Sequence, residues 1–133
     1  MSRVLLALIH GFEEVEALTA VDILRRGGVD VITTSLGDSP LVTGRHEVPV
    51  LADALFEGDF PTDFDMIVIP GGTIAYVDHP GFMSYVRQFA AKKKPIAAIC
   101  AAPAVLGRLG LLKGKTCVCY PGMEHEMVGA NIS

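Results

Sequence analysis

The sequence has no tryptophan, only three cysteines and no apolar run long enough to cross a membrane. A membrane span needs about 18 or more apolar residues, whereas the first apolar run, Val4–Ile9, ends almost at once. The acidic letters EEVE (residues 13–16) follow where the cleavage site of a signal peptide would lie. We therefore expect Val4–Ile9 to be a strand, and we expect no membrane partner.

Positive charge is also sparse, since 11 lysines and arginines face 15 aspartates and glutamates. The one cationic run, Lys92–Lys94, closes a predicted helix, where cations complement the helix dipole. Without a basic patch, nucleic acid is not an expected partner. The odd number of cysteines, all at apolar positions, argues against a disulfide framework and favours a cytoplasmic location.

Half of the residues are hydrophobic, and 133 residues suit one domain, 1–133, with a single core. Apolar runs typical of strands alternate with helical patterns, and Pro49 limits one run to the periphery. This alternation predicts an α/β fold in which helices cover both faces of a mainly parallel sheet. The expected strands are 4–9, 30–35, 46–53, 65–70, 95–100 and 115–122, and the expected helices are 13–26, 79–94 and 101–110.

Six strands with only three helices leave a deficit, because a parallel sheet must be covered on both faces. The polar letters EHEMVGANIS (residues 124–133) add no further helix. We therefore expect an incomplete domain that lacks a C-terminal strand and helix, or one that a separate C-terminal fragment completes.

Cys100 stands where a predicted strand meets a predicted helix. The small residues Ala98 and Ala102 flank it as in a nucleophile elbow, and Pro103 suits a first helical turn. A helix N-terminus lowers the pKa of a thiol, which predicts a reactive cysteine. The alternative that the residues leave open is a structural cysteine buried at a strand end.

Ligands of such sheets bind at the carboxyl ends of the strands. This rule places several residues on one rim, where the Ala101 N–H and one from the Gly71–Gly72 turn form a candidate oxyanion hole. A carboxyl of the cluster Glu13, Glu14 and Glu16 is a candidate acid/base, although carboxylates also favour any first helical turn. The spacing does not decide which of them faces Cys100. The rim comprises His10, Gly11, Gly71, Gly72, Cys100, Ala101 and Tyr120.

Neither a metal nor a nucleotide cofactor is expected. Cys117, Cys119 and His125 form no standard zinc pattern, and two cysteines on one face of a strand are expected to pack in the core. The Gly71–Gly72 turn lacks the patterns of phosphate-binding loops.

Three segments closely resemble the ThiJ/PfpI superfamily, in particular the branch that includes the Parkinson-disease-associated protein: HGFEEVEALTAVDILRRGGVDV, DMIVIPGG and PIAAICAAPAVLGRLGLLKGK. The resemblance implies a flavodoxin-like, class I glutamine amidotransferase-like sandwich that dimerises. It also implies that Cys100 is an easily oxidised elbow cysteine bonded to Glu16. Gly71, Gly72 and Ala101 would be the oxyanion donors, with His46 and Tyr120 as accessory positions.

The resemblance also bears on function. The protease-like branch has a histidine directly after its cysteine, and Ala101 stands there in this chain, which disfavours a peptidase. The branch implies a cofactor-independent glyoxalase or deglycase in which Cys100 attacks small reactive aldehydes. The alternatives are an oxidation sensor or redox-regulated chaperone, and a thiazole-biosynthesis-labelled relative of unknown activity.

Overall fold

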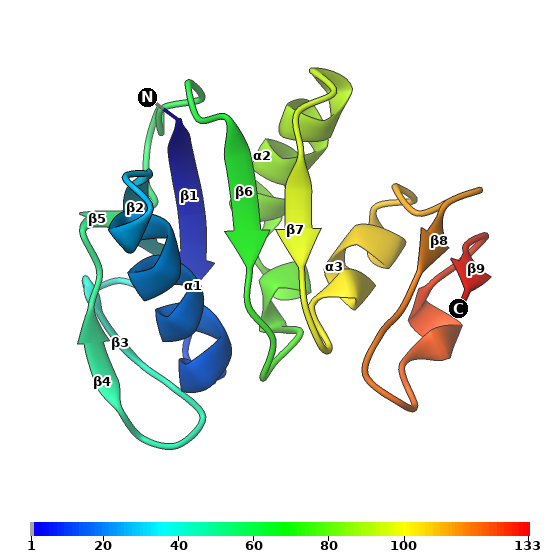
Figure 1. Cartoon of the computed structure of the whole chain (residues 1–133), viewed down its shortest axis with the longest axis horizontal. Coiled ribbons are helices and arrows are strands. Elements are labelled where there is room, and N and C mark those ends of the chain that lie inside the picture. The colour runs from blue at the N-terminus through cyan, green and yellow to red at the C-terminus, as the bar shows by residue number, and fades with distance from the viewer. Residues whose placement is uncertain (1) are drawn as a thin grey trace.

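The central sheet has five parallel strands in the order β5-β2-β1-β6-β7 (Figure 1). The structure, a computed structural model, describes residues 2–133. Strand β1 lies in the middle, with Leu5 opposite Ile32 on one side and Ile67 on the other. The strands are β1 (Arg3–Leu8), β2 (Asp30–Ser35), β5 (Ala54–Leu55), β6 (Met66–Ile69) and β7 (Ile96–Ala98).

Helices cover both faces of this sheet, as predicted. Helix α1 (Glu14–Arg26) lies on one face, and α2 (Pro80–Ala91) and α3 (Pro103–Arg108) lie on the other (Figure 1). Alternate residues of β1 feed the two core layers: Leu5 packs with the side of α2 and α3, and Leu6 with the side of α1. The expected flavodoxin-like α/β class is therefore confirmed.

The helix boundaries follow local sequence signals. Glu13 is the N-cap of α1, and Gly27 ends that helix. Helix α2 begins at Pro80, as a proline in a first turn favours, and the Nδ1 of His79 accepts the N–H of Phe82. These signals act over one turn, which is why the sequence alone places the helix starts closely.

Two of the six predicted strands do not belong to the main sheet, and this corrects the expected strand count. β4 (Pro49–Leu51) pairs with β3 (Leu41–Thr43) in a separate hairpin, as the peripheral position of Pro49 suggested. The strand expected over 115–122 is only β8 (Thr116–Cys117), which pairs with β9 (Asn131–Ile132).

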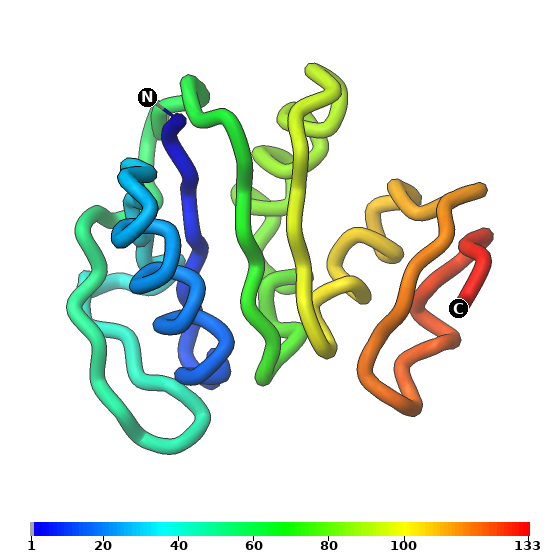
Figure 2. Tube along the Cα trace, in the orientation of Figure 1, coloured from blue at the N-terminus to red at the C-terminus, as the bar shows by residue number. Residues whose placement is uncertain are grey.

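The trace in Figure 2 shows β8 and β9 beyond α3, apart from the five-stranded sheet. Local bonds hold this ribbon, since the N–H of Gly114 donates to Gly129 and that of Asn131 to Lys115. Two short 3-10 helices, η1 (Ala75–Asp78) and η2 (Glu124–Glu126), complete the fold. Within residues 2–133 no helix has the length and hydrophobicity of a membrane span.

Candidate active site

Cys100 occupies a sharp turn between β7 and α3. Its φ of 65° lies in the left-handed region, which residues with a side chain rarely adopt. The N–H of Ile99 donates to Ile69 of β6, and that of Ala102 donates back to Ile99, which closes the turn. The elbow geometry predicted from the small flanking residues is therefore present.

Glu16 reaches this elbow from the first turn of α1. One of its carboxylate oxygens, Oε1, accepts the N–H of Gly71 at 2.8 Å. A Cβ on Gly71 would lie 2.6 Å from that oxygen and 2.8 Å from the Cβ of Cys100. The carboxyl and the cysteine can meet because Gly71 has no side chain.

The pKa of the Cys100 thiol is raised, which contradicts the lowered value expected from the helix N-terminus. Burial is the largest cause, and the negative charge of Glu16 adds to it. The N–H of Ala101 acts in the opposite direction by bonding the sulfur, while the charge of Glu13 raises the pKa further. Helix α3 has only six residues, so its dipole does not outweigh burial and two nearby carboxylates.

The thiol opens onto a cavity of about 390 Å³. Carboxylates, one guanidinium and backbone N–H groups share its wall with an aromatic ring and a thioether. This mixture suits a small polar ligand that exchanges protons with the wall. The lining residues are Glu13, Glu16, Arg45, Gly72, Cys100, Ala101, Tyr120 and Met123.

The three expected oxyanion donors differ in their availability. The N–H of Gly71 is bonded to Glu16, so it positions the carboxyl instead of facing a ligand. The N–H groups of Gly72 and Ala101 have no protein oxygen as partner within residues 2–133, and both residues line the cavity. Gly72 has φ of 94°, and a Cβ there would lie 2.5 Å from the backbone nitrogen of Glu13.

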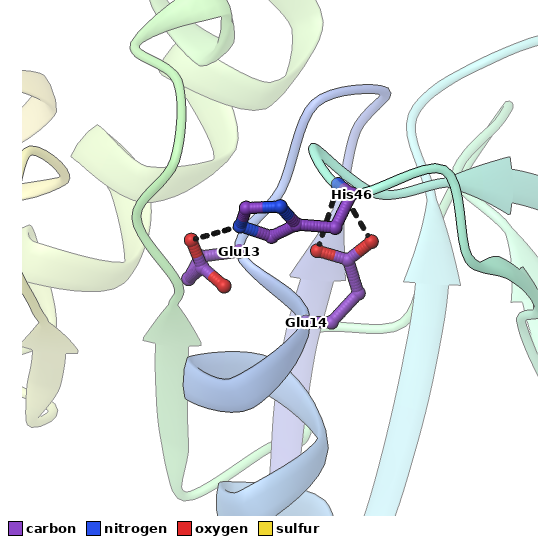
Figure 3. A group of neighbouring side chains, drawn as sticks. All are labelled: Glu13, Glu14 and His46. Carbon is purple, nitrogen blue, oxygen red and sulfur yellow. Dashed lines mark hydrogen bonds and ion pairs between the residues drawn. The ribbon is translucent and has the colours of Figure 1, made fainter.

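Glu13, Glu14 and His46 form a cluster at the start of α1 (Figure 3). The His46 Nε2 lies 3.4 Å from Glu13 Oε2, and the His46 side chain is 66% exposed. The buried Glu14 carboxylate accepts the N–H groups of His46 and Val48. Burial raises the pKa of Glu14, but its own backbone N–H, the N–H groups of Val48 and His46, and the charge of His46 together lower it, and the net shift of the pKa is downward.

This cluster has the composition of a metal site, because its ligand atoms lie within 4.8 Å of one another. The Glu14 carboxylate, however, already holds two backbone N–H groups of the 46–48 loop. Its position is therefore explained by the structure of the loop. His46 approaches the cavity only through Glu13, which lines it.

Tyr120 lies on the cavity although it follows β8, which is outside the main sheet. Its N–H donates to the Cys100 carbonyl at 2.8 Å, which ties this segment to the elbow. His10 instead accepts the N–H of Thr43 through Nδ1 and so braces the β3–β4 hairpin. Cys117 and Cys119 are half-buried against the core, as predicted.

Arg45 is the cavity residue that the sequence reasoning missed. Its Nη1 donates to the carbonyl of Gly72 at 3.1 Å, and its N–H donates to Phe12. The neighbouring Gly44 matters as well, since a Cβ there would collide with the Glu14 side chain. Only the adjacency of Arg45 to His46 could have drawn attention to it, because the loop path is set by tertiary contacts.

A parallel sheet with an elbow cysteine and a facing carboxyl is the arrangement of a class of cysteine-centred α/β proteins. The family model described as the DJ-1/PfpI family matches residues 2–133. The chain therefore belongs to the DJ-1/PfpI family.

Curated relatives share about a third of its residues. Protein DJ-1 homolog B of Arabidopsis thaliana is 34% identical over 129 residues, which cover 94% of this chain and 30% of that protein. A deglycase of Pyrococcus horikoshii is 30% identical, covering 98% of this chain and 79% of the relative. A Bacillus subtilis relative, 32% identical with the same two coverages, is named as a cysteine protease. The chain thus spans about a third of the Arabidopsis relative and most of the other two.

Solved structures agree with the fold. A DJ-1 superfamily protein of Salmonella typhimurium, crystallised as a cysteine-to-alanine mutant, gives a TM-score of 0.90 at 34% identity, covering 100% of this chain and 74% of that one. The oxidised DJ-1 of Toxoplasma gondii gives 0.87 at 37% identity, with coverages of 95% and 71%.

Proposed function

We propose that the chain is a cysteine-dependent, cofactor-independent glyoxalase or deglycase that acts on small reactive aldehydes such as methylglyoxal. The observation that carries the proposal is the strained Cys100, which opens on a polar cavity beside the Glu16 carboxyl and the N–H groups of Gly72 and Ala101, neither of which is taken up by a protein oxygen within residues 2–133. The deglycase name of the Pyrococcus horikoshii relative supports the same chemistry.

The first step forms a bond between the Cys100 sulfur and the aldehyde carbon. Glu16 takes the thiol proton as the sulfur attacks, so the raised pKa of the thiol is no obstacle to a general-base mechanism. The π electrons of the carbonyl move to its oxygen, and the N–H groups of Gly72 and Ala101 bind the resulting alkoxide. The proton returned by Glu16 gives a neutral hemithioacetal.

The later steps convert that adduct. With methylglyoxal, a carboxylate removes the C–H proton of the former aldehyde carbon, and protonation of the neighbouring carbon gives a thioester. Water then attacks the thioester and releases lactate and the free thiol. The sum is methylglyoxal plus water to lactate, with no external oxidant or reductant.

The test is lactate production from methylglyoxal by the purified chain. We expect Cys100→Ala to abolish turnover, and Glu16→Gln to reduce it by roughly 100-fold or more, as the loss of a general base does. Cys117→Ser is a matched control that keeps turnover, because its sulfur lies outside the cavity. Turnover that survives Cys100→Ala contradicts the proposal.

An oxidation sensor or redox-regulated chaperone is the second candidate. It is favoured by the N–H of Ala101 at the Cys100 sulfur, which can also stabilise a sulfinate oxygen. The oxidised state named for the Toxoplasma gondii structure agrees with it. A selective gain of two oxygens on Cys100 under mild peroxide, with no lactate formed, would favour this function over the first.

A peptidase is a weaker candidate despite the name of the Bacillus subtilis relative. A cysteine peptidase needs an imidazole base at its thiol. The groups that line the cavity around Cys100 are two carboxylates, a guanidinium and a phenol, with Ala101 directly after the cysteine.

We also propose that the chain forms a homodimer through α1 and the β3–β4 hairpin. Several large apolar side chains are exposed on these elements, among them Val15 of α1 and Leu51 of β4, each 71% exposed. Large exposed apolar residues that gather on neighbouring elements mark interfaces. Native mass spectrometry tests this proposal: Val15→Lys should yield the monomer, and a wild-type monomer at micromolar concentration would contradict it.

A further inference from the structure

A second cavity lies away from Cys100, between helix α2 and the loop that follows β5. Its volume is about 670 Å³, against about 390 Å³ for the cavity at Cys100, and the two have no lining residue in common. Residues 56–62 form one wall, and residues of the 79–88 segment form the other. This volume is in the range of small-ligand sites, and the proposed catalytic chemistry does not use it.

Four aromatic rings line this second cavity. The Phe56 ring stands steeply against those of His79 and Tyr85, with interplanar angles of 73° and 88° and centroid distances of 5.7 and 5.3 Å. The Phe60 centroid lies 5.0 Å from that of Phe56 and 5.9 Å from that of Tyr85. Rings at steep angles form walls that offer faces as well as edges, and a ring face is the negative side of the aromatic quadrupole.

The charges that line the cavity have one sign. Glu57 and Asp59 supply two exposed carboxylates, and within residues 2–133 no lysine or arginine lines the cavity. The His79 Nδ1 accepts the N–H of Phe82 at 3.0 Å, so that nitrogen carries no proton and the ring adds no positive charge. The electrostatics of the walls therefore favour a cation.

The N-terminus of α2 also borders the cavity, and a helix N-terminus by itself favours an anion. Its backbone donors are largely engaged, because the N–H of Phe82 bonds the His79 side chain and that of Met83 bonds the His79 carbonyl. Pro80, the first residue of the helix, has no N–H. The helix end corresponds to roughly half a positive charge, which the two carboxylates outweigh.

Hydrogen bonds hold the loop wall in place. The Tyr85 hydroxyl donates to the Pro61 carbonyl at 2.5 Å, which ties the loop to α2. The N–H of Phe56 donates to the Ser35 carbonyl at 2.8 Å, which ties the loop to β2. A cavity whose walls are held before a ligand arrives loses little conformational entropy when the ligand binds.

We propose that this cavity is a binding site for a small quaternary ammonium ion, for which choline is the probe. Ring faces attract such a cation, and they do so more strongly where water is excluded. The carboxylates of Glu57 and Asp59 add an attraction that solvent and salt screen in part. The inference does not depend on the proposed aldehyde chemistry, because the two cavities are separate.

The first test is an NMR titration of the native chain with choline at constant ionic strength. We expect saturable binding with a Kd on the order of 1–10 mM, and a shift of the choline methyl protons to lower frequency by ring currents. The uncharged analogue, with a tert-butyl group in place of trimethylammonium, should bind at least about fivefold more weakly. Equal binding of the two compounds, or no saturation by about 100 mM choline, would overturn the proposal.

Variants test whether choline binds in this cavity. Glu57→Gln combined with Asp59→Asn should weaken choline binding by at least about threefold, since both charges are removed. Phe56→Leu keeps an apolar side chain without the ring and should weaken binding by about fivefold. Both carboxylates are exposed, so the charge variant keeps the fold even if the Phe56 variant does not.

The matched control is Glu47→Gln combined with Asp38→Asn. It removes the same two charges at exposed positions outside the cavity, so it should bind choline as the wild type does. Choline binding that a folded cavity variant leaves unchanged, or that the control weakens equally, would overturn the proposal.

Discussion

At the scale of single residues, the elbow combines a strained cysteine with a glycine that leaves room for a carboxyl. The left-handed φ of Cys100 turns the chain out of β7, and Gly71 lets Glu16 approach from α1. Positive φ at a residue with a side chain costs free energy, on the order of 1–3 kcal/mol, and persists where the surroundings enforce it. Here the bonds of Ile99 and Tyr120 on either side of the turn enforce it.

Gly71→Ala tests this account of the elbow. The new Cβ would lie 2.6 Å from Glu16 Oε1, 2.8 Å from the Cys100 Cβ and 2.9 Å from the Ile99 carbonyl. We expect the free energy of unfolding to fall by about 1–3 kcal/mol, as overpacking does. Methylglyoxal turnover should fall about a hundredfold, because the reacting groups are displaced.

Gly27→Ala is the matched control, because a Cβ there meets only ordinary contacts, 3.5 Å away at the nearest. Urea unfolding and lactate production measure the two effects separately. If Gly71→Ala retained full turnover and stability, the close approach of Glu16 and Cys100 would not be needed.

At the scale of elements, Glu14 fastens the loop after β3 to the start of α1. Its carboxylate accepts the N–H groups of His46 and Val48, and the same loop carries Arg45 into the cavity. Glu14 does not line the cavity, but its carboxylate holds the loop that places Arg45 in the cavity wall.

The lowered pKa of Glu14 predicts how this support depends on pH. A carboxyl whose pKa is lower in the folded than in the unfolded chain stabilises the fold above its unfolded pKa, about 4.3. That stability is lost as pH falls through the lower folded pKa. We expect Glu14→Gln to destabilise the chain at pH 7, and the difference from wild type to shrink below about pH 4. Urea unfolding at several pH values measures it, and a difference independent of pH would contradict the assignment.

Helix α3 is held by close contact with η2. A Cβ on Gly107 would collide with the carbonyl of Glu126, and Arg108 pairs with the Glu126 carboxylate. We expect Gly107→Ala to destabilise the chain by roughly 1–3 kcal/mol despite the better helix propensity of alanine. Gly81→Ala in α2, where the nearest atom is a histidine carbon at 3.4 Å, is the control in urea unfolding. Equal free energies of unfolding for the two variants would contradict this account, because they would show that η2 moves away from the new Cβ at no cost.

At the scale of the whole molecule, the sequence was informative wherever the structure depends on nearby residues. Continuous apolar runs such as Val4–Ile9 identified buried parallel strands, and Pro80 and Gly27 marked helix ends. The rim rule also placed Cys100 and Gly72 together correctly, whereas Tyr120, which follows a strand outside the main sheet, reaches the cavity through its bond to the Cys100 carbonyl.

The sequence was uninformative where distant segments decide the outcome. Arg45 reaches the cavity because the Glu14 carboxylate holds the loop that contains Arg45. Strand β8 is short and pairs with β9, which lies at the C-terminal end of the chain and not next to β8 in the sequence. The direction of the Cys100 pKa shift depended on the balance of burial and two carboxylates against one N–H donor. The spacing of residues along the chain does not reveal how deeply the thiol is buried or which charged groups lie beside it.

The central claim is that Cys100 and Glu16 act as one proton-transfer unit. Its most direct test is the titration of thiolate absorbance in the wild type and in Glu16→Gln, each in a Cys117→Ser, Cys119→Ser background. We predict that the Cys100 pKa lies above its usual value in the wild type and falls in Glu16→Gln, because the carboxylate charge is removed. A wild-type pKa below the ordinary ~8.5, or one that Glu16→Gln leaves unchanged, would contradict the account.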